Sequence, residues 1–366
     1  MKRLGLVVCG VLLLSAWSVG CKPEAPAETP PAGGEVAGDK APVAESPLVV
    51  ARKNASSFKV LPASFGKDGQ TTAQEELGRM LYYDARLSKN HDVSCSSCHD
   101  LASYGVDGKP TSSGHRAQLG GRNSPTVYNA AAHVAQFWDG RAADVEAQAR
   151  GPVLNPIEMA MPDEASVVTV LTSIPGYGES FKKAYPDQEA PITYDNMAAA
   201  IGAFERKLVT PSRWDKFLGG DDKALTDKEI EGLNLFASAG CVGCHDGAAV
   251  GGGSFQKVGV VRPWPNQADT GRMAVTSKGE DKMMFKAPSL RNIARTGPYF
   301  HDGSVADLKE AVKMMGAHQL GRDLTDAEIA SIVEWLNALT GDLPTEYIQK
   351  PTLPENGPET PAPDPS

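Results

Sequence analysis

The sequence predicts an all-α fold with long loops, built as two similar domains. Three segments combine a helix-start signal with apolar residues at helical spacing, and no segment keeps a sustained period-two alternation. Two of these helices each run into a Cys-x-x-Cys-His motif. A chain of 366 residues is long enough for two domains that each have their own core.

The three helices are each expected to begin at a capping box, in which Thr and a Glu three residues later satisfy the first backbone donors. The boxes are Thr72–Glu75, Thr226–Glu229 and Thr325–Glu328. The third helix should stop at Gly341, because glycine favours the backbone that ends a helix. A further helical pattern over Met197–Leu208 should close the first domain. The domain boundary is therefore predicted near Thr210-Pro211.

The two motifs are Cys95-Ser-Ser-Cys98-His99 and Cys241-Val-Gly-Cys244-His245. Two thiols at this spacing can each add to a vinyl group of one haem, and the following histidine is then held against the iron. A zinc site or a disulfide pair is the alternative. Zinc would need a second Cys or His pair nearby, and the only other cysteines, Cys9 and Cys21, lie in the N-terminal leader and directly after it. The sequence therefore predicts two covalent haems c in two cytochrome-c-like domains.

The N-terminus is typical of an export signal, predicted over residues 1–20. Lys2 and Arg3 precede an apolar run that is too short to span a membrane. Cleavage by an ordinary signal peptidase is one outcome. The pattern before Cys21 also resembles a lipoprotein signal, although Ser18 stands where leucine is usual. We expect a periplasmic protein that is lipid-anchored through Cys21, since haem c is attached outside the cytoplasm.

The remaining boundaries follow from composition. Residues 21–47 are rich in Pro and Ala and should form a tether, and residues 346–366 should form a disordered tail. The first domain is then 48–210 and the second is 211–345. A net charge of -9 argues against a nucleic-acid partner, which would require a basic surface.

The second axial ligand decides whether an iron relays electrons or performs chemistry. In the second domain the candidates are His301, Met314, Met315 and His318. Met315 ends a helical stretch at a normal distance from His245, although both methionines could instead be core residues. Methionine raises the reduction potential, so a haem held by His245 and Met315 would relay electrons.

The first domain leaves more alternatives open. Met159 and Met161 follow His99 at distances where a cytochrome methionine could sit, and Glu158 lies beside them. His115 lies in a Gly-, Ser- and Thr-rich stretch, predicted to be a mobile loop, and could cap the iron in one state and leave it in another. His91, His133 and His318 are interpreted as structural.

Five further segments accompany the two motifs in order. They are Leu77–Ser88 (LGRMLYYDARLS), Arg122–Thr126 (RNSPT), Gln136–Ala142 (QFWDGRA), Ala287–Asn292 (APSLRN) and Pro298–Gly303 (PYFHDG). From about Leu61 to Pro344, the chain resembles the bacterial di-haem cytochrome c peroxidases. The resemblance implies a homodimer that reduces hydrogen peroxide with electrons from a small cytochrome c or blue-copper protein.

The resemblance also implies roles for individual residues. The first haem is then peroxidatic, with His99 proximal, His115 as a distal ligand that must leave, and Gln148 and Glu158 lining the emptied pocket. Met315 is the distal ligand of the electron-accepting haem, and Trp138 lies between the haems. An inter-domain calcium site is implied at Asn123 and at the backbone carbonyls of Thr296 and Pro298.

The expected chemistry is a proton transfer between the two peroxide oxygens. Glu158 would accept and return the proton while Gln148 orients the substrate. On the residues alone, Glu158 could equally be an acid in the first turn of a helix after Pro156, where the helix dipole would stabilise it. Trp138 could be an ordinary core aromatic.

Two other functions remain open at this point. A pure electron carrier would have both irons closed. An enzyme like the one that matures methylamine dehydrogenase would instead oxidise a protein partner, but such enzymes place a tyrosine where this chain has Met315.

Overall fold

Helices supply nearly all the regular structure of residues 45–366, which are the residues that the computed structural model describes. The α-helices are α1 (Pro47–Asn54), α2 (Thr72–Tyr83), α3 (Cys95–Cys98), α4 (Val145–Leu154), α5 (Glu164–Thr172), α6 (Pro175–Ala184), α7 (Tyr194–Glu205), α8 (Arg213–Leu218), α9 (Asp227–Ala239), α10 (Met273–Thr276), α11 (Leu308–Met314) and α12 (Asp326–Ala338). Two three-residue strands, β1 (Phe255–Lys257) and β2 (Met284–Lys286), pair antiparallel. The predicted signal peptide, Cys21 and most of the tether lie outside the described residues.

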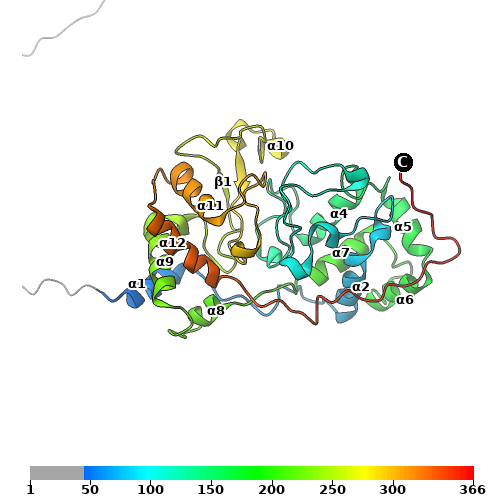
Figure 1. The fold of residues 1–366 in the computed structure, drawn as a ribbon. Coiled ribbons are helices and arrows are strands. Elements are labelled where there is room, and N and C mark those ends of the chain that lie inside the picture. The colour runs from blue at the N-terminus through cyan, green and yellow to red at the C-terminus, as the bar shows by residue number, and fades with distance from the viewer. Residues whose placement is uncertain (1–44) are drawn as a thin grey trace, which may run out of the picture. The chain divides into compact units, whose positions relative to one another are not determined.

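Residues 45–366 form two large hydrophobic cores and a small third cluster around Trp264, Met283 and Phe285. The first is built by α2, α4, α5, α6 and α7, and the second by α1, α8, α9 and α12, as Figure 1 shows. The all-α prediction of two cytochrome-c-like domains is confirmed. No helix among residues 45–366 is long and apolar enough to cross a membrane.

A glycine lies at the main helix crossing of each core. A β-carbon on Gly78 of α2 would lie 1.8 Å from the Ala200 main-chain oxygen of α7. A β-carbon on Gly232 of α9 would lie 1.9 Å from the Ser331 oxygen of α12. Only glycine permits so close an approach of two helices. Both domains therefore use a glycine to build the same kind of helix crossing.

The capping boxes at Thr226 and Thr325 are confirmed. The first box is one residue earlier than predicted, with Thr71 capping α2 and Gln74 completing the box. The sequence pattern fits a box that begins at Thr71 as well as one that begins at Thr72. Glu75 does not take part in the cap: it is buried, and its carboxylate accepts a hydrogen bond from Lys207 Nζ at 2.9 Å.

The predicted boundary near Thr210 is a buried junction. Thr210 Oγ1 accepts hydrogen bonds from the side-chain amides of Asn129 and Asn292, each at 2.9 Å. In return, Asn129 Oδ1 accepts from the Thr210 main chain at 3.1 Å, and Asn292 Oδ1 accepts from the Gly341 main chain at 2.9 Å. One loop from each domain is therefore held at the same point.

Each end of the described chain packs against the domain at the opposite end of the sequence. This arrangement corrects two predicted boundaries. Helix α1, expected in the first domain, packs against α9, and its Ala51 lies in the second core. Tyr347 stacks on Phe204 at 5.1 Å and Ile348 is buried in the first core, so the predicted disordered tail is instead ordered along the first domain. In Figure 1 this red segment passes α2 and α6.

Candidate active site

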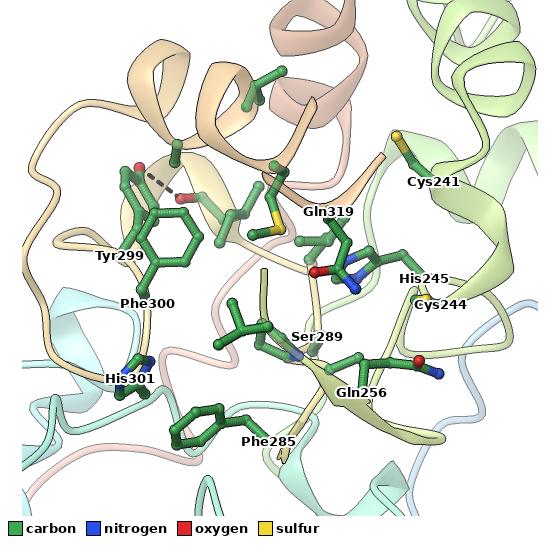
Figure 2. A pocket seen from close by; sticks show the side chains of 18 of the residues that line it. Cys241, Cys244, His245, Gln256, Phe285, Ser289, Tyr299, Phe300, His301 and Gln319 are labelled. Carbon is green, nitrogen blue, oxygen red and sulfur yellow. Dashed lines mark hydrogen bonds between the residues drawn. The ribbon is translucent and has the colours of Figure 1, made fainter. Parts of the chain in front are cut away.

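Each Cys-x-x-Cys-His motif lines a separate cavity. The first cavity has a volume of about 350 Å³, and Cys95, Cys98 and His99 lie in its wall. The second, of about 230 Å³ by the same measure, is lined by the motif at 241–245. Figure 2 shows this second motif on one side, across the cavity from Tyr299, Phe300 and His301.

Tight turns present both thiols and the histidine of each motif together. The His99 main-chain N–H donates to the Cys95 oxygen at 2.9 Å, and the His245 N–H donates to the Cys241 oxygen at 3.1 Å. The Tyr82 hydroxyl stabilises the first turn by donating to the His99 main-chain oxygen at 2.7 Å. The second begins directly after α9, where Gly240 adopts a left-handed backbone with φ of 100°.

The charge states of the motif residues suit covalent haem. Burial lowers the pKa of His99, and it lowers the pKa of His245 to about 4, so both imidazoles are neutral and able to bind a metal. Burial raises the pKa of all four motif thiols, that of Cys241 to about 12. All four thiols are free, and residues 45–366 contain no cluster of three or more His, Cys, Asp or Glu placed for a metal. The zinc and disulfide alternatives therefore lack support.

Glu158 and Gln148 both line the first cavity. Helix α4 carries Gln148, and the Asn155-Pro156 turn after it presents Glu158. Asn155 Nδ2 donates to Glu158 Oε1 at 2.7 Å. Burial raises the pKa of Glu158 even though Arg141 in the same wall lowers it.

His115 does not line the first cavity in this structure, whereas its neighbour Gly114 does. The imidazole is buried against the C-terminal segment, with Nε2 3.1 Å from the main-chain oxygen of Ser366. Of the two alternative methionine ligands, Met159 lines the first cavity and Met161 does not. The structure therefore brings Glu158 and Gln148 together with His99, but not His115.

Met315 lines the second cavity and Met314 does not. Met315 begins a π-helical turn, Met315–Gln319, that directly follows α11. His301 also lines this cavity, stacked on Phe285 at 4.1 Å. His318 lies 3.0 Å from the Pro263 oxygen through its Nδ1 atom, in keeping with a structural role.

The two cavities share a wall. Its residues are Asn123, Pro125, Thr126, Phe137 and Trp138, each of which lines both cavities. Trp138 Nε1 donates to the Asn123 oxygen at 3.0 Å, which joins the two segments of the wall. The indole predicted to lie between the haems is therefore in contact with both cavities.

The three residues predicted for calcium, Asn123, Thr296 and Pro298, line the second cavity together. Asn123 Nδ2 donates to the Lys109 oxygen at 3.0 Å, which leaves Oδ1 as the amide atom able to bind a cation. Oxygen atoms of this kind are the ligands that calcium prefers.

A buried lysine–histidine pair in the second cavity was missed from sequence. Lys286 Nζ lies 2.9 Å from His133 Nδ1, and both residues line the cavity. Burial lowers the pKa of Lys286 to about 8, and no carboxylate pairs with it among residues 45–366. A haem carries two carboxylates, so this amine fits such a group. A lysine within the apolar run Met283–Leu290 was the available signal.

A second acid in the first cavity was also missed. Glu205, at the end of α7, lines the cavity, is 6% exposed and accepts no side-chain hydrogen bond among the described residues. Burial raises its pKa to about 8, and the Glu146 carboxylate adds to this. Sequence periodicity placed the residue on a core helix without showing that its carboxyl faces a cavity.

The comparisons with known proteins agree with this geometry. The family model for di-haem cytochrome c peroxidase matches residues 72–223. The chain is 49% identical to the cytochrome c551 peroxidase of Nitrosomonas europaea over 78% of this chain and 85% of the relative. It is 45% identical to the cytochrome c551 peroxidase of Pseudomonas aeruginosa, over 79% of this chain and 84% of that relative. A crystal structure of a MauG-like protein associated with microbial copper homeostasis superposes with a TM-score of 0.71 at 29% identity, over 80% of this chain and 97% of that one.

The protein is therefore a haem peroxidase with two haems c that reduces hydrogen peroxide. It belongs to the family of di-haem cytochrome c peroxidases. The predicted family is confirmed, and the enzyme is favoured over a pure electron carrier.

Replacing Glu205 by Gln should stabilise the protein at neutral pH. The folded-state pKa of about 8 lies above the ordinary 4.5, so the wild type binds a proton on folding and loses stability as pH rises between these values. Because one pKa unit corresponds to about 1.36 kcal/mol, the variant should gain at most roughly 4 kcal/mol by the upper end of this range.

Denaturant unfolding of both proteins across this pH range measures the difference. Glu189→Gln, at an exposed position, is the control and should change nothing. A gain for Glu205→Gln that does not depend on pH would contradict the assigned cause.

Proposed function

We propose that the first haem is the peroxidatic one, and that electrons enter at the second haem from a small exported cytochrome c or blue-copper protein. The observation that carries this assignment is the asymmetry of the cavities. The first brings Glu158 and Gln148 together with His99, whereas the second brings Met315 together with His245.

Bound haem would supply an iron that binds peroxide at the first site and exchanges electrons at both. Glu158 then accepts a proton from one peroxide oxygen and returns it to the other, so that two electrons and two protons convert one peroxide into two waters. Its raised pKa suits both halves of this transfer. The Gln148 amide can donate to one oxygen and accept from the other, which orients the substrate.

Trp138 offers a path between the haems, because it contacts both cavities. Its hydrogen bond to the Asn123 oxygen fixes the indole in the shared wall. The proposed order is therefore donor, second haem, Trp138 region, first haem and peroxide.

A calcium ion bound by Asn123 and by the carbonyls of Thr296 and Pro298 would stabilise this shared wall. All three residues line the second cavity, and Asn123 also belongs to the wall. Isothermal titration of chelator-treated holoprotein with calcium tests the site. Equal calcium affinity in Asn123→Leu would contradict it.

The cellular setting is proposed from the N-terminal sequence. A signal over residues 1–20 would export the chain to the periplasm, and acylation of Cys21 would anchor it. Mass spectrometry of the N-terminal peptide from native membranes tests the lipid. Sedimentation of the holoprotein tests the homodimer that the family resemblance implies.

Glu158→Gln should lower kcat/KM for peroxide by about 10²–10⁴-fold, because the amide cannot carry the proton. Gln keeps an oxygen that can accept the bond from Asn155, so the fold and the spectra of both haems should persist. Stopped-flow peroxide consumption with a reduced donor measures the loss. Glu164→Gln, whose carboxylate is exposed outside the cavity, is the matched control. Unchanged turnover in Glu158→Gln would remove the acid–base role.

Met315→Leu should lower the reduction potential of the second haem and slow donor-driven turnover, because thioether ligation raises the potential. The adjacent Met314→Leu is the matched control and should leave both unchanged, since Met314 does not line the cavity. Potentiometric titration followed in the visible spectrum measures both haems separately. The opposite pattern, with Met314→Leu carrying the effect, would reassign the ligand.

A further inference from the structure

The C-terminal segment ends beside the residue predicted to cap the first haem. We propose that residues 351–366, here called the strap, are a positioning element that holds His115 outside the first cavity. This inference rests on the proposed peroxidatic role of the first haem. The strap would thereby set whether that iron is open to peroxide.

The middle of the strap is anchored on the first domain. Arg86 Nη1 donates to the Pro354 oxygen at 2.9 Å and to Asn356 Oδ1 at 2.6 Å. The Ser173 and Thr360 hydroxyls lie 3.1 Å apart. Gly357 packs so closely that a β-carbon there would lie 2.2 Å from the Ser173 oxygen. These contacts fix the path of the strap before it reaches His115.

Lys89 fastens the end of the strap. Its ammonium donates to the Ser366 main-chain oxygen at 2.8 Å and to Ser366 Oγ at 3.0 Å, and it pairs with Asp364 at 3.4 Å. The Asp364 N–H donates to the Lys89 oxygen at 2.9 Å. Lys89 N–H in turn donates to the Met159 oxygen at 2.8 Å, next to Glu158 in the chain. The strap is therefore tied to the segment that carries the proposed acid–base residue.

The Ser366 oxygen then engages the imidazole of His115. His115 Nε2 lies 3.1 Å from this oxygen, which can only accept, so Nε2 carries the proton and donates it. A protonated ring nitrogen has no free lone pair with which to bind iron. The other ring nitrogen, Nδ1, is buried and has no hydrogen-bond partner among residues 45–366. The bond to the strap is thus incompatible with ligation through Nε2.

The loop around His115 is strained in this position. Arg116 and Ala117 both adopt left-handed backbone, with φ of 56° and 55°, which costs free energy in residues other than glycine. The His115 N–H donates to the Glu158 oxygen at 2.7 Å, and a β-carbon on Gly114 would lie 2.1 Å from the Ile157 oxygen. A strained loop needs partners that favour one position, and contacts made only in that position shift its equilibrium. The strap supplies such a contact.

Deletion of residues 351–366 tests the proposal in the fully oxidised holoprotein. We expect the first haem of the wild type to be high-spin, with His115 outside the cavity. The deletion should raise the ratio of low-spin to high-spin first haem by on the order of tenfold, as expected for the loss of a charge-supported hydrogen bond. Electron paramagnetic resonance measures this ratio, and hydrogen exchange at residues 113–118 should become faster.

Three further variants make the result specific. Adding His115→Ala to the deletion should restore the high-spin signal. Lys89→Met keeps the whole chain and should reproduce part of the shift, whereas Lys228→Met, at an exposed site in the second domain, should not. An unchanged second-haem spectrum shows that each variant is folded.

The proposal is wrong if the deletion and Lys89→Met leave both readouts unchanged, or if the wild-type first haem is already low-spin through His115. These outcomes are separate from failure of the proposed function. That failure would appear as full peroxide turnover in Glu158→Gln, whatever the spin state.

Discussion

The buried hydroxyl of Thr210 connects the two domains, and the geometry of both cavities depends on it. Asn129 and Asn292 donate to this one oxygen, and each asparagine adopts left-handed backbone with φ of 60° and 62°. Pro125 and Thr126 lie just before Asn129 and line both cavities, while Pro288, Ser289 and Leu290 lie just before Asn292 and line the second. Loss of a shared buried acceptor would leave two amides unsatisfied, which is costly in a dry interior. The junction therefore sets the position of one cavity wall relative to the other.

Ion pairs support the same region: Arg122, which is partly buried, joins the two domains, and Arg291 and Asp215 form a buried pair within the second domain. Arg122 donates to Asp139 of the first domain at 2.5 Å and to Asp269 of the second at 2.6 Å. Arg291 pairs with Asp215 at 2.5 and 2.9 Å, and the guanidinium holds the pKa of that carboxyl below its usual value. Breaking one partner of such a pair would leave an uncompensated buried charge. Trp138 thus lies in a wall whose position is fixed from both domains.

Local chemistry explains which features were predictable from sequence. The haem motifs and the caps at Thr226 and Thr325 depend on residues near one another in the chain. The cap at Thr71 was misplaced because two overlapping registers satisfy the same pattern, and burial of Glu75 decides between them. Lys286, His133 and Glu205 acquire their environments only when distant segments meet around a cavity.

The position of His115 shows the same limit most clearly. Composition indicated a mobile loop. The contacts that hold His115 are made by Ser366 to the imidazole and by the Glu158 oxygen to the main-chain N–H, and no local pattern relates either residue to it. The prediction of a disordered tail was wrong for a related reason. Its Pro-rich composition cannot form a core, yet Tyr347 and Ile348 can complete a core that another segment has left open.

The crossing of the chain ends limits how separable the halves are. The core of each domain includes residues from the far end of the polypeptide. Ala51 and Phe58 belong to the core around α9, and Ile348 belongs to the core around α2. A fragment cut at residue 210 would expose these surfaces on both sides of the cut. The molecule is interlocked rather than modular, so neither cytochrome unit can be exchanged for a foreign one without also replacing the opposite terminus.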